Sequence, residues 1–152
     1  MRLFERFGLA GLTLVLAAGW SYRELAYAFD GPKELSSTTI NLDAVKMVTT
    51  IDRGEPVGLN GVYLAGDTPA STKFVTGRFV LPAGKTPHAP HTHAEEEIMI
   101  VESGHGEILC DGKTTKVGPG SVMYTVPNAP HGITNTGDEP IVFYYVKWES
   151  RK

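Results

Sequence analysis

Short runs of β-prone residues, separated by turn sequences, follow one another along the chain from Gly61 onward. Eight such runs, rich in Val, Ile, Phe and Tyr, lie at residues 62–65, 74–81, 97–101, 106–110, 114–117, 121–126, 132–135 and 141–148. Runs of this length and composition, bounded by Gly, Pro, Asn and Asp, predict strands. The turn Asp111-Gly112 between two of them is typical of a β-hairpin. The pattern therefore predicts an all-β fold, either a barrel or a sandwich.

The segment before these runs has a weaker pattern. Leu42, Val45 and Val48 are spaced as one face of a short helix, but the same spacing also fits a loose strand. We assign residues 29–60 as an N-terminal extension and residues 61–149 as a single β-barrel domain. At 152 residues the chain has room for one domain with one hydrophobic core.

The N-terminal region has the organisation of an export signal. A basic start with Arg2 and Arg6 precedes an uncharged, apolar run at residues 7–20. These 14 residues are fewer than the roughly 18 that a membrane-spanning helix requires. We predict a signal peptide at residues 1–28 and a periplasmic or secreted protein. Two alternatives stay open: an anchor in the inner membrane formed by residues 7–20, and a buried N-terminal helix. The candidate cleavage patterns are Ala26-Tyr27-Ala28, which we prefer, and Ala17-Ala18-Gly19.

Composition excludes several classes of partner and site. The net charge is -3, and the Lys and Arg residues are scattered rather than gathered in a stripe, which argues against binding to nucleic acid. Cys110 is the only cysteine, so the chain has neither an internal disulfide nor a cluster of thiolates for a metal. Any metal must therefore be held by histidine and carboxylate side chains.

One strand carries residues with such chemistry. In an extended chain every second side chain points the same way, so His91, His93 and Glu97 would share a face with Met99 and Val101. Both faces of this strand are otherwise apolar. A carboxylate buried there must pair with cations or a metal, or else take up a proton.

A third histidine, His131, completes a possible ligand set for one metal ion. Three neutral imidazoles and one carboxylate suit a divalent transition metal such as Mn, Fe, Co, Ni, Cu or Zn. An octahedral ion with these four ligands would keep two positions open for water, oxygen or substrate. Open positions are what a catalytic metal site needs.

The spacing of these residues resembles the two motifs of the cupins. The first is Gly84, then His91-Thr92-His93, three residues, Glu97, six residues and Gly104. The second is Gly120, five residues, Val126-Pro127-Asn128, two residues, His131, three residues and Asn135. The sequence departs from the family pattern by one extra residue before His91, by Val126 in place of Pro and by Asn128 in place of Gly. Asn tolerates a positive φ, so the turn before His131 can still form.

The resemblance implies a conserved barrel of two antiparallel sheets, the jelly-roll-like double-stranded β-helix, with the four named residues on the metal. It also favours a homodimer. Apolar residues on both faces of the last strand, Tyr144 and Val146 against Tyr145, independently indicate a surface covered by a second subunit. The resemblance does not imply a reaction, because cupins include dioxygenases, decarboxylases, isomerases, lyases, seed storage proteins and sugar-binding regulators.

Strand parity and side-chain size suggest which residues share the cavity with the metal. The expected pocket residues are Phe79, Met99, Tyr124 and Tyr145. A shift of register by one residue would exchange Tyr124 with Met123 and Tyr145 with Tyr144. Arg78 and Lys85 are candidates to meet an anionic substrate at the rim.

Other polar residues near the motif are assigned as follows. His88 is either a proton shuttle at the barrel mouth or an exposed residue, and Glu97 is a metal ligand that could also act as a base. Asn135 is expected to shape a turn. Glu95 and Glu96 are expected to face solvent, and His105 is expected in a loop.

These features predict an exported, metal-dependent oxidoreductase, of the oxygen-using dioxygenase type, acting on a small organic molecule bound at the ion. Two alternatives remain. One is a non-catalytic module that uses the ion to hold a carboxylate, a sugar or a polyphenol. The other is a metal-dependent lyase or isomerase that does not use oxygen.

Overall fold

The computed structural model describes residues 34–152, so the expected export signal lies outside the described residues. The strands are β1 (Val48–Asp52), β2 (Glu55–Gly66), β3 (Ser71–Leu81), β4 (Glu96–Ser103), β5 (Gly106–Cys110), β6 (Lys113–Val117), β7 (Val122–Thr125), β8 (His131–Thr134) and β9 (Ile141–Ser150). The 3-10 turn η2 (Leu42–Ala44) precedes β1. Within this part of the chain, no helix is long and apolar enough to cross a membrane.

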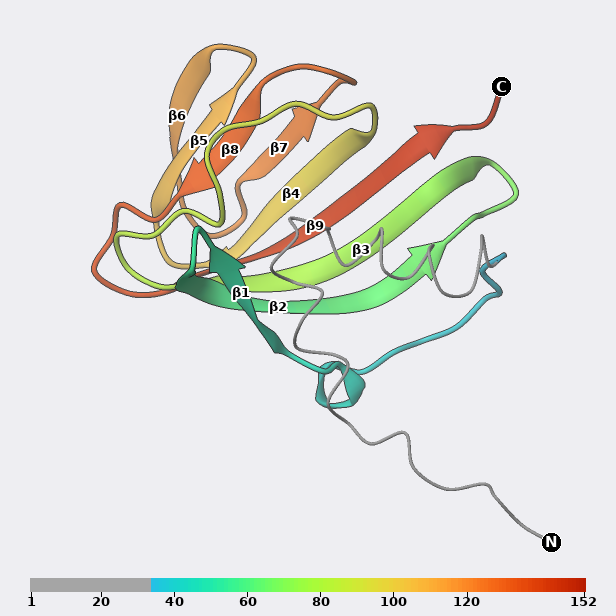
Figure 1. The fold of residues 1–152 in the computed structure, drawn as a ribbon, viewed down its shortest axis with the longest axis horizontal. Helices are drawn as coiled ribbons and strands as arrows, with labels where there is room; N and C mark the ends of the chain where they lie inside the picture. Colours follow the sequence, from blue (N-terminus) through green and yellow to red (C-terminus); the bar gives the residue numbers. More distant parts are fainter. Residues whose placement is uncertain (1–33) are drawn as a thin grey trace, which may run out of the picture.

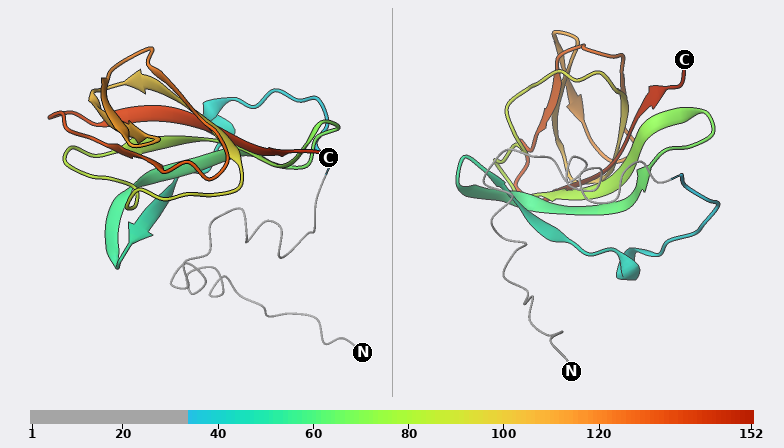
Figure 2. Two further views of the ribbon diagram at one scale, coloured as in Figure 1. Left: turned by 90° about the horizontal axis from the view of Figure 1, so that it is seen from above. Right: turned by 45° about the vertical axis from the view of Figure 1, so that its right-hand side comes forward.

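The strands form two sheets that face each other. The larger sheet has the order β1-β2-β3-β9-β4-β7 and the smaller one has the order β6-β5-β8. All strand pairs in both sheets are antiparallel. The smaller sheet stands over the β4 and β7 side of the larger sheet, whereas β1 and β2 lie at the opposite edge (Figures 1 and 2). The expected barrel of two antiparallel sheets is confirmed.

Each of the eight runs read from the sequence overlaps one strand of the structure. The hairpin at Asp111-Gly112 is also present, with φ values of 48° and 79°, and it joins β5 to β6. Strand β1 was not resolved by the sequence pattern. It forms because Arg53 and Gly54, at φ 50° and 86°, make a second tight turn that folds it back onto β2. The barrel sheet therefore begins at Val48, inside the segment assigned as an extension.

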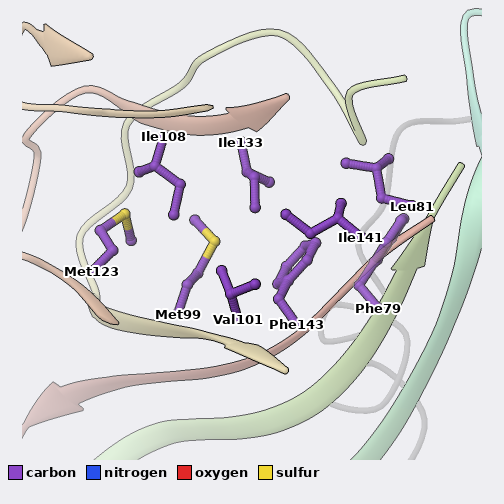
Figure 3. Packing of buried hydrophobic residues seen from close by; sticks show 9 residues of the cluster. All are labelled: Phe79, Leu81, Met99, Val101, Ile108, Met123, Ile133, Ile141 and Phe143. Carbon is purple, nitrogen blue, oxygen red and sulfur yellow. The ribbon is translucent and has the colours of Figure 1, made fainter. Parts of the chain in front are cut away.

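The hydrophobic core lies between the two sheets. Figure 3 shows Ile108 and Ile133 of the smaller sheet packed over side chains of the larger sheet. The core members are Phe79, Leu81, Met99, Val101, Ile108, Met123, Ile133, Ile141 and Phe143. The rings of Phe79 and Phe143 are stacked with centroids 5.5 Å apart. The core fills one end of the barrel, and the ionisable side chains of the inner faces gather toward the other end.

The loop between β3 and β4 runs beside β8 almost as an added strand. Asn135 and Lys85 are joined by a backbone hydrogen bond of 2.9 Å, and the Thr86 hydroxyl donates to the carbonyl oxygen of Ile133. Further along, His91 and His131 form an isolated antiparallel bridge. These contacts fix the histidine-bearing loop to the smaller sheet before the chain enters β4.

Candidate metal centre

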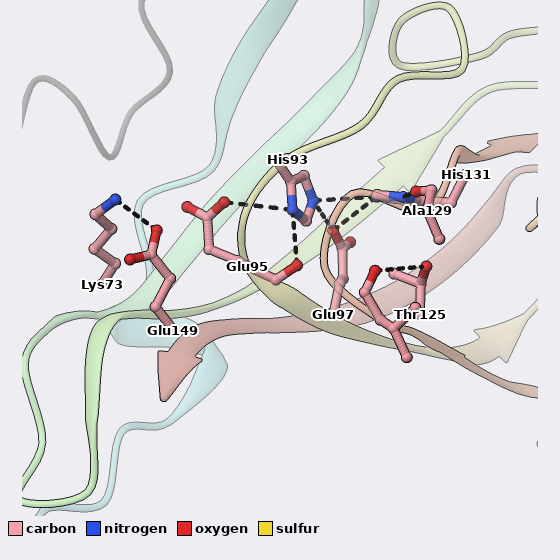
Figure 4. Close-up of polar contacts among 9 residues, drawn as sticks. Lys73, His93, Glu95, Glu97, Thr125, Ala129, His131 and Glu149 are labelled. Atoms are coloured by element: carbon pink, nitrogen blue, oxygen red, sulfur yellow. Dashed lines mark hydrogen bonds and ion pairs between the residues drawn. The ribbon is translucent and has the colours of Figure 1, made fainter. Parts of the chain in front are cut away.

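Two sheets contribute side chains to one cluster. His131 is the first residue of β8 in the smaller sheet, and an isolated bridge outside the strands holds His91 opposite it. Glu97 is the second residue of β4 in the larger sheet. His93 lies in the segment between His91 and the start of β4. Residues of both sheets therefore meet in the cluster, and Figure 4 shows His93, Glu97 and His131 pointing toward one another.

The donor atoms of the cluster are in close contact. One donor atom from each of His91, His93 and His131 lies within 4.8 Å of the others. The Nε2 atoms of His93 and His131 are 3.1 Å apart. The Oε2 atom of Glu97 lies 2.8 Å from Nε2 of His93 and 3.3 Å from Nε2 of His131. The predicted ligands are thus brought together.

Hydrogen bonds fix the protonation of two rings. Nδ1 of His131 donates to the carbonyl oxygen of Ala129 at 2.9 Å, and Nδ1 of His93 donates to that of Glu95 at 3.1 Å. A carbonyl oxygen can only accept, so in the neutral ring the proton sits on Nδ1. The two Nε2 lone pairs then face each other and a carboxylate oxygen. Such an arrangement requires a cation, either a proton or a metal ion, among the three atoms.

The distances fit a metal ion. Neighbouring ligands of an octahedral ion, each about 2.1 Å from it, lie about 3 Å apart. The three measured separations, between 2.8 and 3.3 Å, form one triangular face of such a site. In addition, Nδ1 of His91 is buried and has no hydrogen-bond partner among the described residues. The Nδ1 hydrogen bonds of His93 and His131 fix their tautomers, which is what a metal-binding imidazole needs from its surroundings.

The electrostatics also favour positive charge in the cluster. Burial opposes ionisation of Glu97, but hydrogen bonds from His131 and His93 outweigh it and lower the pKa of its carboxyl group to about 2. Burial likewise works against a charged His131, yet its hydrogen bond to Glu97 raises its pKa overall. Burial, with the neighbouring His88, lowers the pKa of His91 to about 4. At neutral pH the cluster therefore offers an ionised Glu97 and a neutral His91, the forms that bind metal, while the Glu97 carboxylate draws positive charge toward His131.

The inner face of the larger sheet is ordered in rows across the strands. The row nearest the cluster pairs Glu97 with Thr125 on one side and with Lys147 on the other. The next row pairs Met99 with Met123 and Tyr145. Directly opposed residues share a face, so these side chains all point into the barrel.

Tyr145 occupies its position because the facing residue is a glycine. A Cβ atom on Gly77 would lie 2.4 Å from the Tyr145 hydroxyl, so only glycine leaves room for the ring. The hydroxyl donates to Oδ1 of Asn60 at 3.0 Å. Burial raises the pKa of Tyr145 to about 12. The phenol is therefore neutral at neutral pH, and its one proton is held by Asn60.

Two of the expected pocket residues lie elsewhere. Tyr124 is 51% exposed, and its hydroxyl donates to Glu96 at 2.7 Å on the outer face, whereas Met123 is 5% exposed and points inward. The assignment of Tyr124 was wrong because the register sets Met99 opposite Met123. Phe79 is buried, but across the sheet it lies in the same row as Phe143 and Val101. Val101 is four residues beyond Glu97 on β4, which is roughly 13 Å along the strand. Phe79 belongs to the core, and Met99 and Tyr145 remain beside the cluster.

Glu95 was expected to face solvent, and this was wrong. Its side chain is only 3% exposed, and its carboxylate lies 3.3 Å from Nδ1 of His93. The spacing of two residues to Glu97 was the signal for an inward position, since parity applied to His93 and Glu97 applies equally to Glu95. A carboxylate behind a ligating imidazole orients the ring and increases its basicity.

The remaining sequence candidates lie around the cluster. His88 is exposed, with its ring edge-on to that of His91 at a centroid separation of 4.2 Å. Arg78 is paired with Glu102 at 3.1 Å, and its guanidinium lies over the ring of Tyr144, on the outer face. Lys85 is exposed in the loop. Arg78 therefore does not point into the barrel.

The turn before His131 has the geometry that the sequence required. Asn128 has a φ of 63°, in the left-handed region that Gly favours and that Asn tolerates. Its backbone N–H donates to the carbonyl oxygen of His93 at 2.8 Å. This turn therefore links the segment carrying His93 to the segment carrying His131.

Comparison with known proteins agrees with this geometry. Residues 77–147 match the family model described as "Cupin domain". The barrel has the cupin fold. Both motifs read from the sequence, from Gly84 to Asn135, lie inside the matched region.

Several solved structures share the cupin fold of this chain. A predicted oxalate decarboxylase from Thermotoga maritima is similar at 25% identity with a TM-score of 0.56, over 69% of this chain and 91% of that one. A cupin-2 domain protein from Rhodospirillum rubrum has a TM-score of 0.61 at 14% identity, over 80% of this chain and 79% of that one. KdgF from Halomonas has a TM-score of 0.58 at 17% identity, over 77% of this chain and 96% of that one.

Proposed function

We propose that this protein is a small, single-barrel cupin that binds one divalent transition-metal ion and uses it in an oxidoreductase reaction, of dioxygenase type, on a small organic molecule. The ligands are the three clustered histidines and Glu97. The observation that carries the proposal is the convergence of two Nε2 atoms and one carboxylate oxygen at separations of 2.8–3.3 Å. An ion bound there would act as a Lewis acid and as the meeting point of oxygen and substrate.

The side chains around the cluster support chemistry on a molecule held at the ion. Tyr145 lies one row from Glu97, and because its hydroxyl is engaged with Asn60, it contributes its ring to the wall beside the cluster. Met99 and Met123 form an apolar floor beside it. His88, exposed and in contact with His91, is the candidate for moving a proton between the site and solvent.

A second reaction is favoured by a specific similarity. The Thermotoga maritima protein that shares 25% identity with this chain is described as a predicted oxalate decarboxylase. Cleavage of a small carboxylic acid at the metal, without net consumption of oxygen, is therefore the alternative.

One experiment separates these functions. The full chain, loaded in turn with Mn, Fe, Co, Ni, Cu or Zn, is supplied with oxalate and a panel of small phenols and keto acids under air and under nitrogen. Oxygen uptake that depends on metal and substrate supports the oxidoreductase, and carbon dioxide release that persists under nitrogen supports the decarboxylase. Binding without any product at every metal loading would instead establish a ligand-binding module.

His88 provides a more specific test of catalysis. If His88 moves protons for the reaction, His88→Ala should keep the metal and lower turnover about a hundredfold, the usual scale for one acid-base group. His105→Ala, in an exposed loop, is the matched control and should keep full turnover. Turnover that does not respond to His88→Ala would remove this residue from the proposal and leave the metal chemistry intact.

Export is proposed on the sequence of residues 1–28. The intact mass of protein from its native host should correspond to a chain that begins near Phe29 or Trp20. Retention of Met1 on a protein recovered from the cytoplasm would refute export.

A further inference from the structure

The basic side chain of Lys147 points into the barrel next to the cluster, a position that depends on strand pairing. Lys147 lies directly opposite Glu97 in the register between β9 and β4. Opposed residues of an antiparallel pair have Cβ atoms about 5 Å apart on the same face. Lys147 is therefore a lateral neighbour of a candidate metal ligand, on the inner face of the sheet.

The position of its ammonium group is set by Tyr145, two residues earlier on the same face. The Lys147 Nζ atom lies over the Tyr145 ring, 6.0 Å from its centroid. The Tyr145 ring is in turn fixed by its hydrogen bond to Asn60 and by the close approach of Gly77. The positive charge of Lys147 contributes to lowering the pKa of both Glu97 and His131, so its field reaches two members of the cluster.

The balance of charges in the metal-loaded site indicates the sign of the charge that a bound molecule should carry. A divalent ion brings two positive charges, and Lys147 adds a third. The buried carboxylates of Glu97 and Glu95 offset two of them. An excess positive charge in a half-buried site attracts an anion. A molecule that contacts both the metal ion and the Lys147 ammonium must carry acceptor atoms at both of its ends.

From this geometry we infer that Lys147 binds the second acceptor group of a small carboxylate whose first group is held at the metal. The inference rests on the proposed metal site and names the class of molecule it takes: a short, anionic acid such as a dicarboxylate or keto acid. Lys147 is thus a residue that determines specificity for charge, and it is not a metal ligand.

Oxalate and its neutral diamide, oxamide, form a matched pair of probes. They have the same shape, and only oxalate carries charge. We expect calorimetric titration of the Mn-loaded full chain to show oxalate binding at least tenfold tighter than oxamide binding. Lys147→Gln should weaken oxalate binding at least tenfold and leave oxamide binding and metal content unchanged. Lys147→Arg should restore part of the oxalate affinity, because it restores the charge.

Lys113→Gln, at an exposed position of β6, is the control for a general loss of positive charge and should bind oxalate as the unaltered chain does. Equal oxalate binding by Lys147→Gln at full metal content would overturn the inference, as would equal affinity of the unaltered chain for both probes. Absence of metal from the unaltered chain would instead refute the proposed function. The metal assay therefore distinguishes the two failures. Thermal unfolding of each variant verifies that a loss of binding is not a loss of fold.

Discussion

His91 and His131 each donate a backbone N–H to the carbonyl oxygen of the other, and both hydrogen bonds are 3.0 Å long. The two candidate ligands are therefore held opposite each other by main-chain atoms. Because the bridge does not involve the imidazoles, removal of either ring should leave the loop attached to β8. Loss of metal and loss of fold can then be measured separately.

We predict that His91→Ala and His131→Ala abolish stoichiometric metal binding and that Glu97→Gln weakens it. Each change removes or neutralises one donor of the set. Metal content after dialysis, measured by elemental analysis, should approach one ion per unaltered chain and fall well below that in the alanine variants. His105→Ala, which alters an exposed histidine outside the cluster, should keep the ion. Full occupancy in His131→Ala would mean that the ligand set is misassigned.

The metal-free protein should lose stability toward acid in two steps. His91 has a folded pKa of about 4 against an ordinary value of 6.5, so the unfolded chain binds its proton first and the free energy of unfolding falls as the pH drops from 6.5 to 4. Glu97 has a folded pKa of about 2 against 4.5, which extends the loss from pH 4.5 to 2. The raised pKa of His131 acts in the opposite sense, because its contribution is present at low pH and is lost as the pH rises through that pKa.

Urea unfolding in the presence of a chelator tests this pH dependence. His91→Ala should flatten the upper step, and Glu97→Gln should flatten the lower one. An unchanged slope between pH 6.5 and 4 in His91→Ala would show that this ring does not titrate as its burial implies.

The sequence was sufficient to predict that these three histidines and Glu97 lie together, because their spacing repeats a motif whose parts are all local. His91, His93 and Glu97 lie within seven consecutive residues, and His131 follows a turn that Asn128 makes possible. Most strands were likewise visible as short β-prone runs between turn residues. Local patterns of this kind do not depend on which strand pairs with which.

Features that depend on register were not visible in the same way. Tyr124 and Met123 are both plausible interior residues by size, and only the pairing of β7 with β4 decides between them. Lys147 is recognisable as a neighbour of Glu97 only when β9 is known to lie beside β4. Parity with Tyr145 would still have placed Lys147 on the inner face.

The turn at Asn128 gives a test of backbone geometry. At a φ of 63°, Asn128→Ala should lower the free energy of unfolding by about 1 kcal/mol, because a Cβ without a compensating polar group is strained there. Asn128→Gly should cost little or nothing. The alanine variant should also bind metal more weakly than the glycine variant, since this turn joins the His93 and His131 segments. Equal stability of the two variants in chemical denaturation would contradict the argument.

Asn135 should be the residue of the second motif that matters for stability rather than for the metal. Its buried amide donates to the carbonyl oxygens of Leu81 and Glu139 and accepts from the N–H of Gly137. Asn135→Ala leaves these groups without a side-chain partner and should cost about 2–4 kcal/mol in free energy of unfolding. The exposed neighbour Thr136 provides the control, and Thr136→Ala should change stability by less than about 0.5 kcal/mol. Metal content should be equal in both folded variants.

The outer face of the larger sheet is covered unequally. On its β2 and β3 side, residues 38–42 face the sheet and enclose with it a cavity of about 480 Å³. The walls of this cavity are formed by Thr38, Ile40, Asn41, Leu42, Tyr63, Leu64, Thr76 and Tyr144. On the β4 and β7 side no described segment lies over Ile100, Val122 and Tyr124, which are 41%, 65% and 51% exposed. Large apolar side chains left together on one face mark a contact surface.

We propose that a second copy of the chain covers this face in a two-fold dimer, so that Val122 packs against the partner. Val122→Asp should place a charge in that interface and shift the protein to monomer at micromolar concentration, as measured by light scattering after size-exclusion chromatography. Ile51→Asp changes another exposed apolar residue, 48% accessible, on β1 at the opposite edge of the sheet and should leave the dimer intact. A monomeric unaltered chain, or a dimer that tolerates Val122→Asp, would refute this interface. The metal content should stay the same in all three proteins, because Val122 points away from the barrel interior that holds Glu97.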